Sequence, residues 1–207
     1  MNKKTILITG LLTISPMIFG LLNYTRLPAT MVTHWGINGE PNGYSSRTFV
    51  VFGLPLFLLV ILMIAAFATT TDPKHTNVSA KIRNLVPWIV PTISLFIFYV
   101  IYANALGYHV DVSSLSMMLI GIMFIIIGNY MPKTRQNYTI GIRVPWTLDD
   151  EDNWNATHRF AGKLWFFGGL AFLIMCFLQL VNPVILIIYI FIITLIPIIY
   201  SYMYSKR

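Results

Sequence analysis

"LWFFGGLAFLIMCFLQLVNPVILIIYIFIITLIPIIYSYM" (Leu164–Met203) is the stretch that decides the fold of this chain. It holds two apolar runs, Leu164–Val181 and Val184–Met203, which only Asn182-Pro183 separates. A helix needs roughly 20 apolar residues to cross about 30 Å of hydrocarbon, so the stretch is too long for one crossing. Because proline favours a break, we predict two membrane-spanning helices joined by a short hinge.

Four more runs of this kind precede it, and none of the six contains Asp, Glu, Lys, Arg or His. The chain of 207 residues is 57% hydrophobic and only 10% charged, whereas a soluble domain carries about 25% charged residues. We therefore predict an all-α, polytopic integral membrane protein whose six helices form a single membrane domain over residues 1–207. The four further spans are expected at Thr5–Tyr24, Phe49–Ala68, Val86–Leu106 and Val112–Met131.

The first apolar run is interpreted as a helix that stays in the protein. It follows Lys3 and Lys4, as a signal peptide would, but at about 20 residues it is longer than a signal peptide's apolar region, and no small-x-small cleavage site follows. The chain has one cysteine, Cys176, within the fifth run. It cannot form a disulfide within the chain and is expected to be a small packing residue.

The basic residues predict the orientation, since Lys and Arg near helix ends mark the cytoplasmic side. With the N-terminus inside, only Arg26 and Arg47 of the 14 basic residues face outward. Both termini are then cytoplasmic, and the protein is a multi-pass protein of the plasma membrane. The net charge of +7 follows from this topology and from attraction to anionic lipid, and needs no nucleic-acid partner. The basic residues assigned to the inside are Lys3, Lys4, Lys74, Lys81, Arg83, Lys133, Arg135, Arg143, Arg159, Lys163, Lys206 and Arg207.

Two connections are long enough to carry structure, an outer loop at residues 25–48 and an inner loop at residues 132–163. In the inner loop, Thr147 fits a helix N-cap followed by acidic residues, which favour the positive end of a helix dipole. We therefore predict a helix over Leu148–Gly162, lying at the cytoplasmic interface between the fourth and fifth spans. Trp154, His158 and Ala161 fall on one stripe of this helix.

Neither loop carries a recognised catalytic or metal motif. The inner loop has a single histidine and lacks CxxC and HExxH patterns, so we expect no metal, no cofactor and no enzymatic activity. On the outer side, His34, Glu40, His109 and Asp111 could bind zinc or a cationic peptide, although ordinary polar loop residues give the same pattern. The outer loop is rich in glycine, asparagine and proline, which predicts a compact series of turns, and Trp35 suits the outer headgroup level.

The stretch "GNYMPKTRQNYTIGIRVPWTLDDEDNWNATHRFAGKLW" (Gly128–Trp165) resembles the signature of the SdpI family of bacterial membrane proteins. Val144 and Asn153 depart from the family pattern, where Thr and an apolar residue are usual. The outer segment "LPATMVTHWGINGEPNGYSSR" (Leu27–Arg47) is similar to one found in many members. The matching elements are Gly128-Asn129, Pro132-Lys133, Arg135, Asn137, Gly141-Ile142-Arg143, Pro145-Trp146-Thr147-Leu148, Glu151, Trp154 and Thr157-His158-Arg159.

The resemblance implies an immunity protein that protects the cell against a secreted peptide toxin of the sporulation-delaying class. It also implies a signalling receptor that holds an ArsR-type autorepressor at the membrane. The cytoplasmic residues expected to contact such a partner are Arg143, Pro145, Trp146, Thr147, Glu151, Trp154, His158 and Arg159. The residues expected to face the toxin are His34, Trp35, Glu40, His109 and Asp111.

Two other function classes stay open, an exporter of a peptide or lipid and an enzyme acting on a membrane substrate. The absence of a nucleotide-binding P-loop and of charged residues within the spans disfavours the exporter. The absence of a nucleophile–base pair disfavours the enzyme. The inner loop itself has two interpretations, since it either contacts a cytoplasmic partner or braces the helix ends against the inner leaflet.

Overall fold

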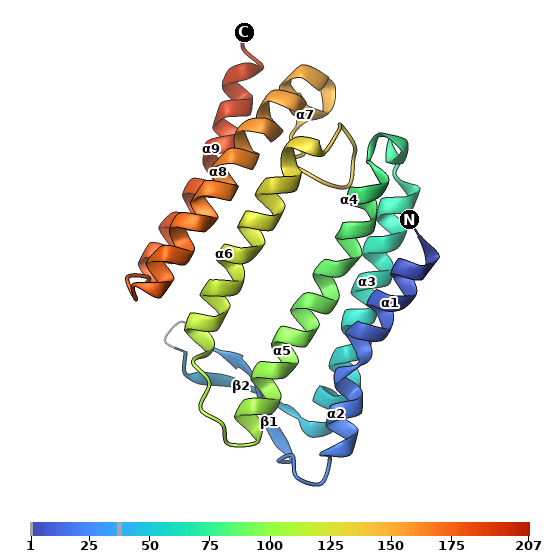
Figure 1. Ribbon diagram of the computed structural model, residues 1–207, viewed down its shortest axis with the longest axis vertical. Helices are drawn as coiled ribbons and strands as arrows, with labels where there is room; N and C mark the ends of the chain where they lie inside the picture. Colours follow the sequence, from blue (N-terminus) through green and yellow to red (C-terminus); the bar gives the residue numbers. More distant parts are fainter. Residues whose placement is uncertain (1, 37–38) are drawn as a thin grey trace. The chain divides into compact units, whose positions relative to one another are not determined.

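The computed structural model describes residues 2–36 and 39–207 and is predominantly helical (Figure 1). Within these residues, six helical segments are long and apolar enough to cross a membrane, which confirms the predicted six spans. They are Lys3–Leu22, Phe49–Thr71, Ala80–Ala105, Val112–Lys133, Glu151–Phe177 and Pro183–Tyr204. The chain divides into two compact units, residues 1–70 with 83–113 and residues 71–82 with 114–207, which are described separately. The single membrane domain stays a prediction.

The first unit contains the first three spans, each with a local irregularity. Helix α1 (Lys3–Ile14) stops at Ser15, and α2 (Pro16–Leu22) begins with a proline at its first position, where the missing N–H costs nothing. A π-helical turn, Phe49–Gly53, leads into α3 (Leu54–Thr71). Helix α4 (Ala80–Leu85) continues through a 3-10 turn, Val86–Trp88, into α5 (Ile89–Ala105).

The outer loop of this unit is a β-hairpin, so the prediction of a series of turns alone is wrong. Strands β1 (Thr30–Trp35) and β2 (Pro41–Ser46) pair antiparallel, and the register is irregular around His34. The alternation of β-branched residues in β1 favours a strand, and the turn-forming residues masked it in the sequence. Residues 37 and 38, which belong to the predicted outer loop, lie outside the described residues. The hairpin is attached to the helices because Leu27 and Met31 are buried with α5 residues in one hydrophobic core.

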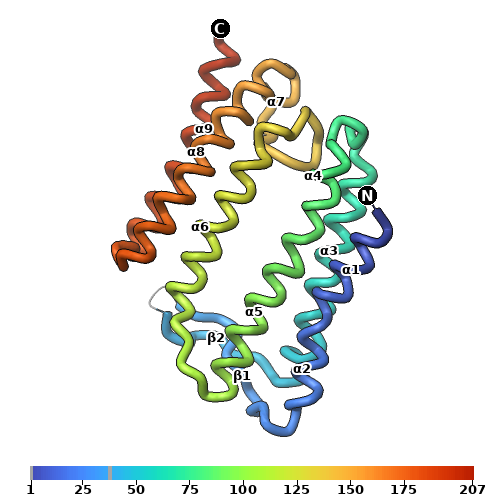
Figure 2. The backbone as a smooth tube through the Cα atoms, viewed as in Figure 1, coloured from blue at the N-terminus to red at the C-terminus, as the bar shows by residue number. Residues whose placement is uncertain are grey.

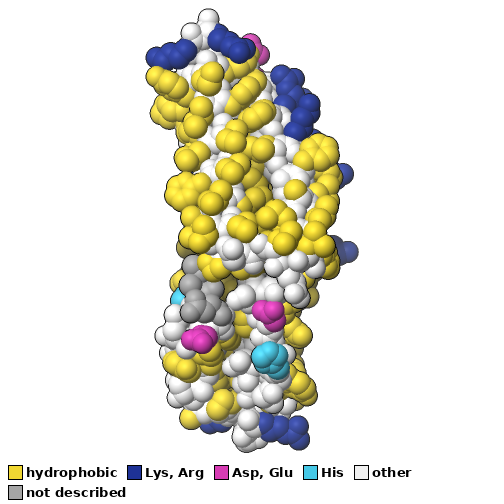
Figure 3. Space-filling model, turned by 90° about the vertical axis from the view of Figure 1, so that its left-hand side faces the viewer, with side chains coloured by type: hydrophobic (Ala, Val, Ile, Leu, Met, Phe, Trp, Pro, Cys, Tyr) yellow, Lys and Arg dark blue, Asp and Glu magenta, His cyan; other side chains and the backbone are white. Residues whose placement is uncertain are grey.

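The second unit contains α6 (Val112–Tyr130), a 3-10 turn at Met131–Lys133, α7 (Pro145–Asp149), α8 (Glu151–Phe177) and α9 (Pro183–Tyr204). A short 3-10 turn, His75–Asn77, also belongs to it. Hydrophobic side chains cover the face that α8 and α9 present, with Lys and Arg side chains at one end (Figure 3). That distribution suits helices surrounded by lipid, with their charged ends in the headgroup region.

Helix α8 differs from the sequence prediction at its start. It runs without interruption from Glu151 through the fifth span, which was expected to begin at Leu164. Its N-cap is Asp150, whose carboxylate accepts from the N–H of Asp152, so Thr147 is not the cap. Thr147 lies instead inside the separate short helix α7. The predicted interfacial helix over Leu148–Gly162 is thus divided between α7 and α8, and its interfacial position stays a prediction.

Glycines bring α6 and α8 into close contact. A Cβ atom on Gly128 would lie 2.5 Å from the backbone nitrogen of Phe166, and one on Gly162 would lie 2.9 Å from the Gly128 carbonyl oxygen. Two turns further along α8, a Cβ atom on Gly169 would lie 2.8 Å from the Gly121 carbonyl oxygen. Small residues let membrane helices approach until their backbones touch, which strengthens dispersion contacts where no hydrophobic effect drives association. These glycines fix the position of α8, which carries most of the family signature.

Candidate functional site

The connection at residues 134–150, which we call the inner connection after its predicted side, folds back beside the ends of α6 and α8 (Figure 2). Its first turn is organised by Asn137, which is fully buried. The Asn137 side-chain oxygen accepts from the N–H groups of Thr139 (2.9 Å) and Ile140 (2.7 Å). Its amide nitrogen donates to the carbonyls of Arg135 and Ile140. One side chain therefore replaces the backbone pairing that a helix or sheet would supply.

Gln136 and Thr147 connect the two ends of the inner connection. The Gln136 amide nitrogen donates to the carbonyls of Thr147 (3.0 Å) and Leu148 (2.8 Å) in α7. The Thr147 hydroxyl oxygen accepts from the N–H of Val144 and lies 2.9 Å from the Ile142 carbonyl, to which it can donate. Both side chains are buried, so each satisfied polar group avoids a desolvation cost of about 1–3 kcal/mol.

Trp154 and His158, one turn apart on α8, form the centre of the site. Both are buried, and their rings stack with centroids 4.0 Å apart. The Trp154 indole N–H donates to the Thr134 carbonyl at 2.7 Å. His158 Nδ1 lies 2.8 Å from the Trp154 carbonyl, and His158 Nε2 accepts from the N–H of Ile142 at 3.0 Å. Only a neutral imidazole with its proton on Nδ1 satisfies both contacts, so His158 joins the inner connection to α8.

Gly141 is required where the connection passes over these rings. Its φ angle is +122°, a conformation that side-chain-bearing residues rarely adopt. A Cβ atom there would come within van der Waals overlap of His158 Nε2 and would lie 3.1 Å from the Trp154 ring. Glycine at position 141 therefore allows the backbone of the connection to lie close to the His158 imidazole.

A second segment of the same unit, which contains Asp72, forms hydrogen bonds with the inner connection. The Asp72 carboxylate accepts from the N–H of Tyr138 (2.8 Å), the hydroxyl of Thr139 (2.6 Å) and the N–H of Lys74 (2.7 Å). Burial raises the pKa of Asp72, but these hydrogen bonds lower it by more, and the net pKa lies below the ordinary value. The Lys74 ammonium also donates to the Gln136 side chain at 2.6 Å.

The eight predicted partner-contacting residues differ in burial and fall into three groups. Thr147, Trp154 and His158 are interior, and their polar groups are used within the connection. Trp146 is half-buried and packs edge-on against Tyr202 of α9. The exposed members are Arg143, Pro145, Glu151 and Arg159.

Arg143 is partly engaged within the connection. Its guanidinium donates to the Tyr138 carbonyl at 2.6 Å. The contact orients the side chain at an exposed position.

The outer residues singled out from the sequence are mostly exposed. His34, Glu40, His109 and Asp111 are exposed and Trp35 is half-buried. His34 Nδ1 contacts the Asn42 side-chain oxygen across the hairpin. Among the described residues, no group of three or more His, Cys, Asp or Glu side chains is arranged to hold a metal ion.

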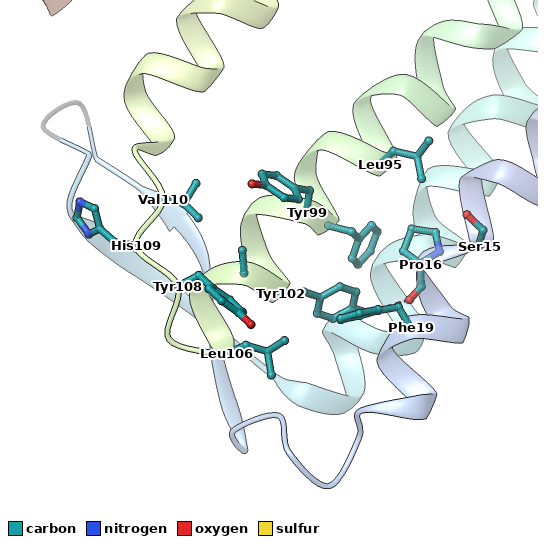
Figure 4. Close-up of a pocket in the computed structure, with 12 residues that line it drawn as sticks. Ser15, Pro16, Phe19, Leu95, Tyr99, Tyr102, Leu106, Tyr108, His109 and Val110 are labelled. Atoms are coloured by element: carbon teal, nitrogen blue, oxygen red, sulfur yellow. Dashed lines mark hydrogen bonds between the residues drawn. The ribbon is translucent and has the colours of Figure 1, made fainter.

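Two features of the structure escaped the sequence analysis. Asn153, which the sequence marked only as a departure from the family pattern, is fully buried and joins α8 to α9. Its side-chain oxygen accepts from the Ser201 hydroxyl at 2.7 Å and its nitrogen donates to the Ser201 carbonyl at 3.0 Å. The second feature is a pocket of about 690 Å³ in the first unit, lined by α5 and the break between α1 and α2 (Figure 4). A polar residue in an apolar stripe was the available signal for the first, and nothing signalled the second.

The six apolar helical segments and the hydrogen-bonded inner connection define the class, a multi-pass helical membrane protein without a recognisable catalytic constellation among its described residues. Residues 133–201 match the SdpI/YfhL protein family, and residues 11–59 match a domain of unknown function, DUF1648. The chain is 28% identical over 148 residues to the immunity protein SdpI of Bacillus subtilis (strain 168), covering 70% of this chain and 68% of that protein. No solved structure matches. The resemblance to the SdpI family is confirmed, and the first match covers most of the inner connection, α8 and α9.

Proposed function

We propose that this protein protects the cell that carries it against a secreted antimicrobial peptide toxin. The observation that carries the proposal is the similarity to the immunity protein SdpI, which extends over 70% of the chain. The polar groups at the centre of the signature form structural hydrogen bonds within the protein. This use of the polar groups supports a binding role over a catalytic one. The exporter, the alternative considered from the sequence, has no observation of its own in its favour.

The orientation is part of the proposal. We place both termini in the cytoplasm, because only Arg26 and Arg47 lie on the opposite side. The hairpin and the connection between α5 and α6 then face outward, where a secreted peptide arrives. His34, Glu40, His109 and Asp111 are exposed on these segments, and we assign contact with the toxin to them.

On the inner side we propose contact with a cytoplasmic ArsR-type repressor through the four exposed signature residues. Arg143 and Arg159 supply guanidinium groups that suit carboxylates of a partner, and Glu151 supplies an acceptor. The buried residues Thr147, Trp154 and His158 position this surface and do not touch the partner. Toxin immunity and repressor binding are thus assigned to opposite faces.

Expression of the chain in a toxin-sensitive bacterium tests the immunity proposal. Cells are exposed to the mature sporulation-delaying peptide, and membrane potential is followed with a voltage-sensitive dye. We expect the potential and viability to be retained, and to be lost in cells that carry the empty vector. Loss in both strains, with the protein confirmed in the membrane, contradicts the proposal.

Cysteine labelling tests the orientation separately. In a Cys176→Ala background, an impermeant thiol reagent should label Asn42→Cys in intact cells and should leave Thr76→Cys and Asp152→Cys unlabelled until the cells are opened. All three positions are exposed, so failure to react reports the side of the membrane. Labelling of Asp152→Cys in intact cells reverses the assignment of both faces.

A further inference from the structure

The pocket of the first unit is formed by three segments that are distant in the sequence. Its walls come from the break between α1 and α2, from the second half of α5, and from the connection that follows α5 (Figure 4). It has a volume of about 690 Å³, within the range of small-molecule and peptide side-chain sites. The twelve lining residues are Ser15, Pro16, Phe19, Leu95, Phe98, Tyr99, Tyr102, Ala103, Leu106, Tyr108, His109 and Val110.

The lining is aromatic and uncharged. Five of the twelve residues are Phe or Tyr, and none is Asp, Glu, Lys or Arg. The polar groups at the closed side are already satisfied, since Ser15 donates to the Leu12 carbonyl and Tyr102 donates to the Pro16 carbonyl. The site therefore favours an apolar ligand and has no charged group to offer an ion.

The pocket extends along the second half of α5 to the connection that follows it, so one of its ends lies at the end of a span. Leu95 and Phe98 belong to α5, which ends at Ala105, whereas Tyr108, His109 and Val110 follow it. At this depth a bilayer changes from hydrocarbon to headgroups, so a lipid presents its ester and glycerol groups there. An amphipathic peptide lying in the interface presents its apolar face at the same depth. The end of the pocket at Tyr108 is therefore open to apolar side chains of a peptide that lies in the interface.

We propose that this pocket binds the toxin by receiving aromatic or branched aliphatic side chains from the toxin's apolar face. The inference rests on the proposed function and adds the site and its chemistry. Tyr99 and Tyr108, which are 61% and 68% exposed, form an accessible rim. Their rings offer contact area at little conformational cost, as tyrosines do in other binding surfaces. His109, predicted to face the toxin, also lines the pocket.

Filling the pocket tests the proposal directly. Ala103→Phe places a ring in the cavity, and Ala171→Phe is the matched control, because Ala171 is exposed on α8 of the other unit. Full-length proteins in nanodiscs are titrated with fluorescently labelled mature sporulation-delaying peptide, while survival is measured in cells. We expect Ala103→Phe to weaken binding about tenfold or more, the effect of excluding one buried apolar side chain. Ala171→Phe should bind like the wild type.

A second variant covers the case in which Ala103→Phe fails to fold. A photoactivatable benzoylphenylalanine at position 108, which is exposed, should crosslink to the peptide when it is present. The pocket assignment is overturned by crosslinking to phospholipid alone, or by equal binding of the peptide to wild type and Ala103→Phe. In either case, protection of cells by the wild-type protein still supports the immunity proposal. Ala103-sensitive binding without any protection in cells supports the pocket and removes the immunity function.

Discussion

The outer hairpin and the inner connection are both long polar segments between apolar spans, yet they use polar residues in opposite ways. The hairpin pairs backbone with backbone and leaves His34 and Glu40 exposed. The inner connection has almost no regular structure beyond α7, and buried side chains such as Asn137 and Gln136 bind its backbone. Exposed polar residues are available to ligands, whereas the buried ones maintain the shape that presents Arg143 and Arg159.

The largest expected effect is at Gly141. Gly141→Ala should destabilise the protein by about 3 kcal/mol or more, because a disfavoured backbone angle and a clash with His158 add together. Gly107→Ala is the matched control, since Gly107 also has a positive φ angle but no atom lies within 4 Å of the added Cβ. It should cost about 1–2 kcal/mol. Equal losses, measured as the free energy of unfolding in detergent, contradict the close approach at His158.

Removing the link between α8 and α9 should have the next largest effect. Asn153→Ala leaves the buried hydroxyls of Thr157 and Ser201 without their shared acceptor and should cost about 1–3 kcal/mol. In a double-mutant cycle with Ser201→Ala, we expect a coupling energy of about 0.5–2 kcal/mol. Additive losses would indicate that the two side chains act independently.

The hydrogen bonds of Asp72 predict a pH-dependent contribution to the stability of the inner connection. Its pKa is lowered in the folded state, so its contribution to stability is fully present above the unfolded value of about 3.9 and is lost as the pH falls toward the folded pKa. Asp72→Asn should therefore reduce stability at pH 7 and flatten the stability profile below pH 4. If Asp72→Asn leaves the dependence of stability on pH unchanged between pH 3 and 5, the result contradicts the hydrogen bond between Asp72 and Thr139.

The spans were predictable because each is a long apolar run, and four of the six begin and end within three residues of the expected bounds. The third begins at Ala80 and not at Val86. The continuity of α8 was not, because the sequence predicted one helix over Leu148–Gly162 and a separate span from Leu164, whereas a single helix begins after the cap Asp150. Side-chain-to-backbone bonds between residues far apart in the sequence, such as Asp72 to Tyr138, leave no periodic pattern. The family signature therefore marked the segment as a candidate site, but the division between its buried and exposed members required the structure.

The smallest effects are expected for exposed residues of both regions. Arg159→Ala in the inner region and Glu40→Ala in the hairpin should each change the free energy of unfolding by less than about 0.5 kcal/mol. Arg159→Ala should leave toxin protection intact and reduce membrane recruitment of a co-expressed ArsR-type repressor. If membrane abundance and protection fall together, Arg159 braces the fold and the partner-contact role is wrong.

Hydrogen exchange of the inner connection tests most directly whether buried side chains fold it. The N–H groups of Tyr138, Ile140 and Ile142 are held by Asp72, Asn137 and His158. In the intact protein in nanodiscs, we expect a peptide covering residues 135–148 to exchange slowly, approaching the behaviour of the spans. Asp72→Asn should speed exchange at Tyr138. Exchange as fast as in an unstructured chain, in the wild-type protein at pH 7, contradicts the account.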